Sequence, residues 1–286
     1  TQKAIFGYGA AASKVSLTNL VSSSGVVAAD TTGVGTARGD LAAAGYGSDK
    51  AIFGYGRTGS SLSLTNLVNN SGVVAADVSG VGTARYYLAA AGYGGDKAIF
   101  GYGTTGSYSS LTNLVSSSGV VATDTTGVGT ARGYVAGVSY GGDKALFAYG
   151  YTGSNVSMSN LISNLGVVSA DVTGVGTARG YLAAASYDTD KAIFGYGYNG
   201  SANLSMSNLV SNNGIVASDV SGVGTARRQL GAAGYGGDKA IFAYGKAGAF
   251  TSIKNLVNSS GVIAADVTGV GTAREAIAAA GYSISA

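Results

Sequence analysis

Lys50-Ala51-Ile52-Phe53-Gly54-Tyr55-Gly56 is one copy of a heptapeptide that recurs six times, with small changes, along this chain of 286 residues. The lysines that open the copies are Lys3, Lys50, Lys97, Lys144, Lys191 and Lys239, so the steps are 47, 47, 47, 47 and 48 residues. One further step of 47 from Lys239 would reach Ala286, the last residue. A constant period in the forties predicts a repeat architecture, and its coincidence with the chain end favours a ring over an open stack.

Within one repeat, four short apolar runs alternate with turn signals. Residues 41–46, 51–56, 61–68 and 73–76 are the runs, and stretches rich in Gly, Ser, Asn and Asp separate them. No run keeps a period of 3.6 residues long enough for a helix, whereas runs of four to eight residues between such turns are typical of antiparallel strands. Each repeat is therefore predicted to form one four-stranded antiparallel sheet.

Six such sheets in a ring give an all-β, six-bladed β-propeller, predicted as a single domain over residues 1–286. The first strand of each repeat, rich in Ala and Gly, is expected to line the central channel, where space is tightest. The chain begins at a second strand and ends with a first strand, residues 276–282. We therefore expect the C-terminal strand to join the N-terminal blade and close the ring, which hides two sheet edges.

The repeat resembles the kelch family of propeller repeats. The shared features are an arginine before the first strand, a Gly-x-Asp turn, and an aliphatic-aromatic strand that ends in glycine, here Ile52-Phe53-Gly54-Tyr55-Gly56. The family's double glycine is Gly-Tyr-Gly or Ala-Tyr-Gly here, and its usual fourth-strand tryptophan is missing. The repeats also resemble Gly/Tyr-rich repeats of bacteriophage and bacterial surface proteins. These resemblances imply a propeller and, more loosely, a virion or cell-surface setting.

Composition excludes several kinds of chemistry. The chain has no Cys, His, Pro or Trp, so disulfides, thiolate metal sites and imidazole bases are absent. The net charge of +3 is too small to indicate a nucleic-acid partner, and no apolar run is long enough for a membrane helix. No cofactor and no metal site are expected. The six repeat arginines are predicted to pair with blade-junction aspartates such as Asp30 or Asp77 rather than to bind an anion.

Comparing the repeats with one another separates constant positions from variable ones. The turns between strands 1 and 2 and between strands 3 and 4 are nearly constant, whereas the loop before strand 3 and the pair after each repeat arginine vary. In an up-and-down blade both variable regions emerge on the same face, which is the usual distribution for binding loops. Of eight charges outside the repeat pattern, seven belong to these regions: Lys14, Asp40, Arg57, Arg228, Lys246, Lys254 and Glu275; Asp188 lies in the opposite turns.

Aromatic, amide and charged side chains in these regions suit a sugar or a protein surface. The predicted binding residues are Asp40, Arg57, Tyr86, Tyr87, Tyr108, Tyr134, Tyr151, Asn155, Tyr181, Tyr198, Asn199, Arg228, Lys246 and Glu275. Asp40 and Glu275 also form a candidate pair of carboxylates for glycoside hydrolysis.

The sequence favours a non-enzymatic binding or structural module, best interpreted as a phage virion, tail-appendage or bacterial surface component that recognises a glycan or protein. Other virion proteins are possible partners, and membrane insertion is not expected. Three alternatives stay open: an intracellular kelch-type interaction scaffold, a glycosidase-like enzyme, and an engineered consensus repeat. The 48-residue fifth repeat and the irregular Asp188-Thr189-Asp190 argue against design.

Overall fold

A computed structural model describes residues 2–283, and within this range every regular element is a strand. The strands are β1 (Gln2–Gly7), β2 (Thr18–Val21), β3 (Ala42–Tyr46), β4 (Lys50–Gly54), β5 (Thr65–Val68), β6 (Ala89–Tyr93), β7 (Lys97–Gly101), β8 (Thr112–Val115), β9 (Ala136–Tyr140), β10 (Lys144–Tyr151), β11 (Asn155–Ile162), β12 (Ala183–Tyr187), β13 (Lys191–Gly195), β14 (Ser207–Val210), β15 (Gly231–Tyr235), β16 (Lys239–Ala243), β17 (Lys254–Val257) and β18 (Ala278–Ser283). The prediction of an all-β chain is confirmed.

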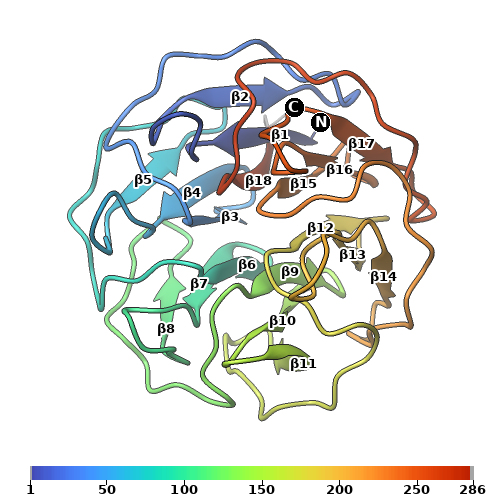
Figure 1. The fold of residues 1–286 in the computed structure, drawn as a ribbon. Coiled ribbons are helices and arrows are strands. Elements are labelled where there is room, and N and C mark those ends of the chain that lie inside the picture. Colours follow the sequence, from blue (N-terminus) through green and yellow to red (C-terminus); the bar gives the residue numbers. More distant parts are fainter. Residues whose placement is uncertain (1, 284–286) are drawn as a thin grey trace.

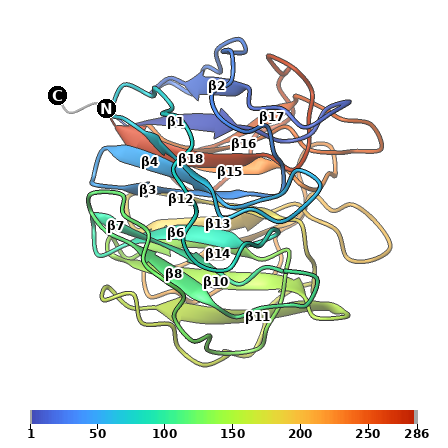
Figure 2. The same cartoon turned by 90° about the vertical axis from the view of Figure 1, so that its left-hand side faces the viewer.

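The strands form six antiparallel sheets of three strands each, one per repeat. In five sheets the strands are consecutive, and in the sixth the order is β18-β1-β2. Figure 1 shows the sheets following one another around a common axis, and Figure 2 shows their strands running along it. The arrangement is propeller-like.

The fourth predicted strand is reduced in every sheet to two isolated contacts with the third strand. In the second repeat, Val74 bridges Val68 and Val78 bridges Thr65. Between these two points the Asn66 side chain donates a hydrogen bond to the Ala75 carbonyl at 3.0 Å. Backbone hydrogen bonds also join the two segments, such as Ala75 N to the Leu67 carbonyl and Val78 N to the Thr65 carbonyl, both at 2.8 Å. These separate contacts hold the segment along the sheet without making it a regular strand.

Strand β18 pairs with β1 over six residues, from Gln2 opposite Ser283 to Gly7 opposite Ala278. The two strands lie side by side in both views (Figures 1 and 2). Strand β18 also contacts β15 and β3, the first strands of the sheets on either side. The two ends of the described chain are therefore joined within one sheet, as the sequence led us to expect.

Every junction between neighbouring sheets has the same aromatic contact. The tyrosine of a Gly-Tyr-Gly or Ala-Tyr-Gly segment meets the phenylalanine of the next sheet edge-on, for example Tyr55 and Phe100 with ring centroids 5.1 Å apart. The junction of the sixth sheet with the first has the equivalent pair, Phe6 and Tyr244, at 5.3 Å. Buried apolar clusters surround all six pairs. The core therefore lies between the sheets and is repeated six times.

The small residues of the first strands fit the space at the axis. A side chain on Gly45 would place its Cβ 3.1 Å from the Gly281 carbonyl oxygen. At Gly234 the corresponding distance to the Ser186 carbonyl oxygen is 2.9 Å. Larger residues would require the first strands to move apart, which accounts for the Ala and Gly in this part of the repeat.

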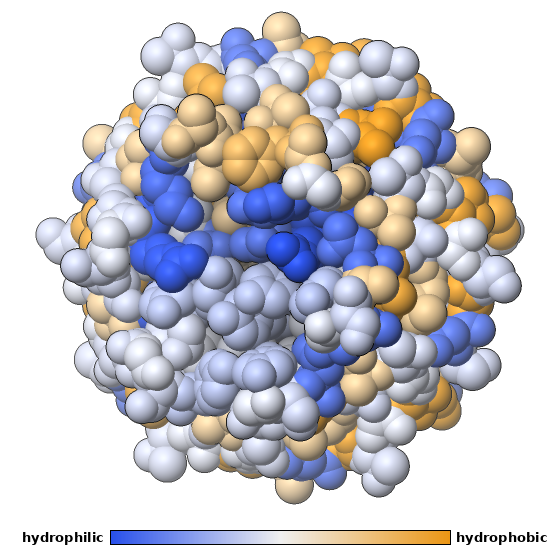
Figure 3. Space-filling model, in the orientation of Figure 1, coloured by the Kyte–Doolittle hydropathy of each residue, from blue (hydrophilic) through white to orange (hydrophobic). Residues whose placement is uncertain are grey.

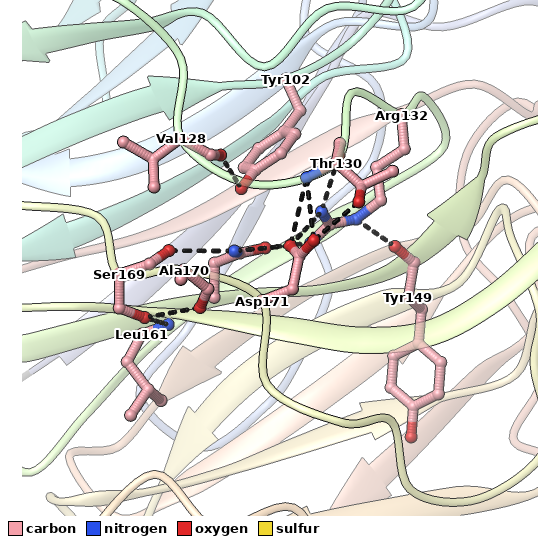
Figure 4. A network of polar contacts seen from close by, with 10 residues as sticks. Tyr102, Val128, Thr130, Arg132, Tyr149, Leu161, Ser169, Ala170 and Asp171 are labelled. Atoms are coloured by element: carbon pink, nitrogen blue, oxygen red, sulfur yellow. Dashed lines mark hydrogen bonds and ion pairs between the residues drawn. The ribbon is translucent and has the colours of Figure 1, made fainter.

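Each repeat arginine is fully buried and joins two sheets. Arg132 donates from Nε to the Tyr149 carbonyl at 2.9 Å, from Nη1 to the Thr130 carbonyl at 3.1 Å, and from Nη2 to Asn160 Oδ1 at 2.6 Å (Figure 4). Its guanidinium carbon lies 4.3 Å from the centre of the Tyr102 ring, which belongs to the preceding sheet. All five other repeat arginines have equivalent contacts: Arg38, Arg85, Arg179, Arg227 and Arg274.

The repeat aspartate completes this network. Asp171 accepts hydrogen bonds from the backbone and hydroxyl of Thr130, at 3.0 and 2.6 Å, and from Asn160 at 2.9 Å. Its carboxylate lies 3.8 Å from Arg132 Nη1. The expected pairing of arginine with aspartate is thus present as an ion pair, and the asparagine side chain is hydrogen-bonded to both partners. We conclude that these residues have a structural role.

Acid is expected to destabilise the protein through the six repeat aspartates. Burial raises the pKa of Asp171, but hydrogen bonds from Thr130 and Asn160 and the charge of Arg132 outweigh it, so the net shift is downward. A folded-state pKa below the unfolded one gives stability that is present above about pH 4 and is lost as pH falls towards the folded value. The urea midpoint should therefore drop between pH 6 and pH 3. Asp171→Asn should lower the midpoint at pH 6 and reduce this drop; a midpoint constant over the range would contradict the assignment.

Candidate functional site

The two variable regions of each repeat meet on one face of the propeller-like arrangement. The residue after each repeat arginine forms an isolated bridge with the residue that follows an aromatic-glycine segment. The six bridges are Gly39 with Arg57, Tyr86 with Thr104, Gly133 with Tyr151, Gly180 with Tyr198, Arg228 with Lys246, and Glu275 with Ala10. We call this side the loop face and the side of the constant turns the turn face. The prediction that both variable regions share a face agrees with this geometry.

A second circle of residues lies closer to the axis on the loop face. The second residue after each repeat arginine has a positive φ, between 53° and 59°: Asp40, Tyr87, Tyr134, Tyr181, Gln229 and Ala276. Backbone hydrogen bonds link five of the six neighbouring pairs, for instance Tyr87 N to the Asp40 carbonyl and Asp40 N to the Ala276 carbonyl. The six residues with positive φ, together with the residue that follows each of them, line a hollow of about 80 Å³, which we call the mouth. Figure 3 shows hydrophilic residues gathered around it.

Positive φ is unfavourable for any residue with a Cβ, by roughly 1–2 kcal/mol, and glycine is the usual occupant. The chain contains 49 glycines, yet none stands at these six positions. Three of them hold tyrosine: Tyr87, Tyr134 and Tyr181. The side chains at the mouth are therefore kept against a local backbone preference.

The three tyrosines form one cluster across the mouth. The Tyr134 ring lies between Tyr87, with centroids 4.0 Å apart, and Tyr181, at 4.1 Å. Tyr87 and Tyr181, from sheets that are not neighbours, are themselves 5.6 Å apart. Tyr151 extends the cluster outwards at 6.1 Å from Tyr134. Burial raises the pKa of Tyr87 and of Tyr181 far above its usual value, so both stay neutral.

Asp40 organises the polar part of the mouth. Its side chain is only 2% exposed and accepts a hydrogen bond from Arg57 Nε at 2.7 Å. Lys14 Nζ lies 3.6 Å from Asp40 Oδ2, and Gln229 Nε2 donates a hydrogen bond to Asp40 Oδ1 at 3.3 Å. Arg57 also donates to the Tyr87 hydroxyl at 2.6 Å, which ties the charged part to the tyrosine cluster. Asp40 is thus occupied by neighbours and is poorly placed to act as a free acid or base.

Glu275 and Arg228 lie on the other side of the polar part. Glu275 Oε1 is 3.9 Å from Lys246 Nζ. Burial raises the pKa of Glu275, while the charges of Lys246 and Arg228 oppose the rise and Asp40 adds to it. The Arg228 guanidinium lies over the Tyr198 ring at 4.7 Å. The mouth therefore has an aromatic sector and a charged sector.

The remaining predicted residues lie at the outer edge of this face. Tyr86 lies under the Arg57 guanidinium at 4.4 Å, and Tyr108 is 6.0 Å from Tyr151. The Asn155 amide approaches the next repeat near Gly180 and Gly200. Asn199 is exposed, but its Oδ1 accepts hydrogen bonds from the backbone of residues 201 and 202 of its own loop. Its side chain thus shapes the loop.

The predicted binding residues leave out Gln229 and Lys14, and the charges assigned to this face wrongly include Lys254. Gln229 and Lys14 both contact Asp40, and the signal for each was that it breaks the repeat pattern. Lys254 was grouped with the charges of this face, which is wrong. It is buried in β17 and donates to the Gly25 carbonyl at 3.3 Å, in a constant turn of the neighbouring sheet. Its long side chain runs back between the sheets, which the sequence position does not reveal.

A larger cavity with a different lining lies at the axis on the turn face. A cavity of about 340 Å³ lies there, lined mostly by constant Gly, Ser, Tyr and Lys residues, among them Gly45, Gly92 and Lys50. In residues 2–283 no group of three or more acidic side chains could hold a metal ion. No helix of that part is long and apolar enough to cross a membrane.

A scan against models of known protein families matches none of them, and no curated protein sequence is similar to the chain. The interpretation of the site therefore depends on its geometry.

Proposed function

We propose that the chain is a closed six-bladed propeller, with the bridged segment as the fourth strand of each blade, that acts as a non-enzymatic binding module through its loop face. The pairing of β1 with β18 and the six equal aromatic junctions support a ring. The bound partner in this proposal is a cell-surface glycan or a protein, and the mouth is the centre of the contact.

One observation carries the proposal: residues that break the repeat pattern converge on the mouth, where strained backbone positions hold tyrosine, aspartate and glutamine instead of glycine. Strain of this kind persists where the side chain has a use. Rigid aromatic rings beside fixed charged groups are typical of binding surfaces, with little ordering cost on contact. The hollow favours a glycan over a flat protein surface. The contacts that occupy Asp40 support a role other than hydrolysis.

The proposal extends to the setting of the protein by resemblance alone. The likeness of the repeats to bacteriophage and bacterial surface proteins favours a virion or cell-surface component, in which other virion proteins are possible partners. The alternative is an intracellular kelch-type scaffold. Capture of a specific protein by the loop face, with no glycan bound, would favour that alternative.

Tyr134→Gly is expected to abolish most glycan binding on an array, a loss of about tenfold or more, because Tyr87 and Tyr181 lose the ring that packs between them and holds them at the mouth. Its thermal midpoint should change little, since glycine relieves the positive φ and offsets part of the lost ring contact.

Tyr102→Gly is the matched control, because Tyr102 also has a positive φ but is fully buried. It should cost about 3–5 kcal/mol in the free energy of unfolding. Equal destabilisation by the two variants, or glycan binding unaffected by Tyr134→Gly, would refute a binding role for the cluster.

A further inference from the structure

The side chains of the loop face are shortest at the sector of the first sheet. Around the outer circle the bridge partners include Arg57, Tyr151, Tyr198 and Lys246, but Ala10 occupies the equivalent place beside β1. Ala276 is the smallest residue of the inner circle and belongs to the same sheet. Ala276 lies between Asp40 and Gln229 in the inner circle, and these two side chains meet beside it, with Gln229 Nε2 donating to Asp40 Oδ1 at 3.3 Å.

Arg228 borders this sector with unused hydrogen-bond donors. Its guanidinium lies near the rings of Tyr198, at 4.7 Å, and Tyr181, at 5.9 Å. Within residues 2–283 no side-chain hydrogen bond or ion pair within 4 Å engages it, whereas Arg57 is held by Asp40 and Tyr87. An arginine fixed by aromatic rings but free at its donor edge is suited to a planar carboxylate, which it can bind through two parallel hydrogen bonds.

Glu275 borders the same sector with an unused acceptor. Its Oε2 is buried and has no hydrogen-bond partner among the described residues, while Oε1 is 3.9 Å from Lys246. A buried oxygen without a partner is costly, and such an atom is satisfied by a donor from outside the chain. A hydroxyl group is the simplest donor that a sugar can supply.

We propose that this sector binds an acidic sugar, with the sugar carboxylate on Arg228 and a ring hydroxyl donating to Glu275 Oε2. The inference rests on the proposed glycan-binding function and specifies its ligand class. A singly charged carboxylate fits better than a phosphate, because the Glu275 carboxylate borders the same sector and would repel a second negative charge.

The test compares an array of uronate- and nonulosonate-containing glycans with their methyl esters, followed by calorimetry on the best binder. Esterification removes the charge and keeps the ring, so the free acid should bind about tenfold or more tightly than its ester. Its affinity should fall as salt is raised. Inorganic phosphate at millimolar concentration should compete poorly; strong competition by phosphate would overturn the carboxylate assignment.

Three variants separate the roles of the two side chains. Arg228→Gln should weaken binding of the free acid to the level of the ester, and Arg228→Lys should restore it only in part, because a lysine cannot form the paired hydrogen bonds. Glu275→Gln should weaken binding of acid and ester alike. Lys144→Gln, which changes an exposed lysine where β10 begins, is the control and should change neither affinity.

Two outcomes distinguish this inference from the proposed function. If acid and ester bind equally, or if only neutral glycans bind and Arg228→Gln leaves their affinity unchanged, the acidic-sugar site is wrong while glycan binding by the loop face stands. If no glycan of either kind binds the folded protein, both proposals fail.

Discussion

Arg132→Met is expected to lower the free energy of unfolding by about 3–5 kcal/mol, the usual cost of removing one partner from a buried charged network. The substitution leaves Asn160 Oδ1 and the Tyr149 carbonyl buried without their donor, and it removes the cation above the Tyr102 ring. It also takes away the charge that faces Asp171. In a chain of this size the loss corresponds to a fall of roughly 10 °C in the thermal midpoint, measurable by calorimetry.

Two further variants serve as comparisons for Arg132→Met. Arg132→Lys keeps the charge but cannot donate in three directions, so it should fall between wild type and Arg132→Met. Lys144→Gln removes an exposed lysine whose nearest carboxylate is at 3.3 Å, and should change stability by less than about 0.5 kcal/mol. A midpoint for Arg132→Met within 2 °C of wild type would show that the network is not a main source of stability.

The period of the repeat was enough to predict strands, their order and the joining of the two chain ends, because these depend on spacing and on small residues. It was not enough to predict how the fourth segment attaches. That attachment combines the Asn66 side-chain hydrogen bond with a few backbone ones, such as Ala75 N to the Leu67 carbonyl. Constancy of a position marks it as structural, but it does not identify the partner. Arg132 and Asn160 are 28 residues apart and meet only through the folded sheet.

Connectivity predicted which face carries the variable residues, since alternate loops of an antiparallel sheet emerge together. It did not predict what those residues do to one another. The Tyr134 ring is enclosed by Tyr87 and Tyr181, so its faces are less open to a ligand than a loop tyrosine would be. Lys254 turns away from the mouth altogether. Such outcomes depend on side-chain conformation and neighbouring sheets, which a single sequence does not encode in any simple pattern.

Deleting residues 275–286 is expected to abolish cooperative folding. The deletion removes β18 and with it the partner of β1 along six residues, so the edge of β1 is exposed. Ile277 and Tyr282, both buried, are lost from the clusters on either side. The backbone link from Asp40 to Ala276 at the mouth is also lost. An exposed apolar strand edge promotes association, so light scattering after gel filtration should show aggregates.

A circular permutant that starts at Ser60 and joins residue 286 to residue 1 is the matched control. Gly59 and Ser60 are exposed, and a Cβ on Gly59 would contact nothing within 4 Å, so new ends there disturb no packing. Because Gln2 and Ser283 face each other in the sheet, the joined ends need to span little distance. The permutant should be as soluble as the wild type and keep most of the thermal stability. A truncated chain as soluble and stable as the permutant would mean that β18 does not close the ring.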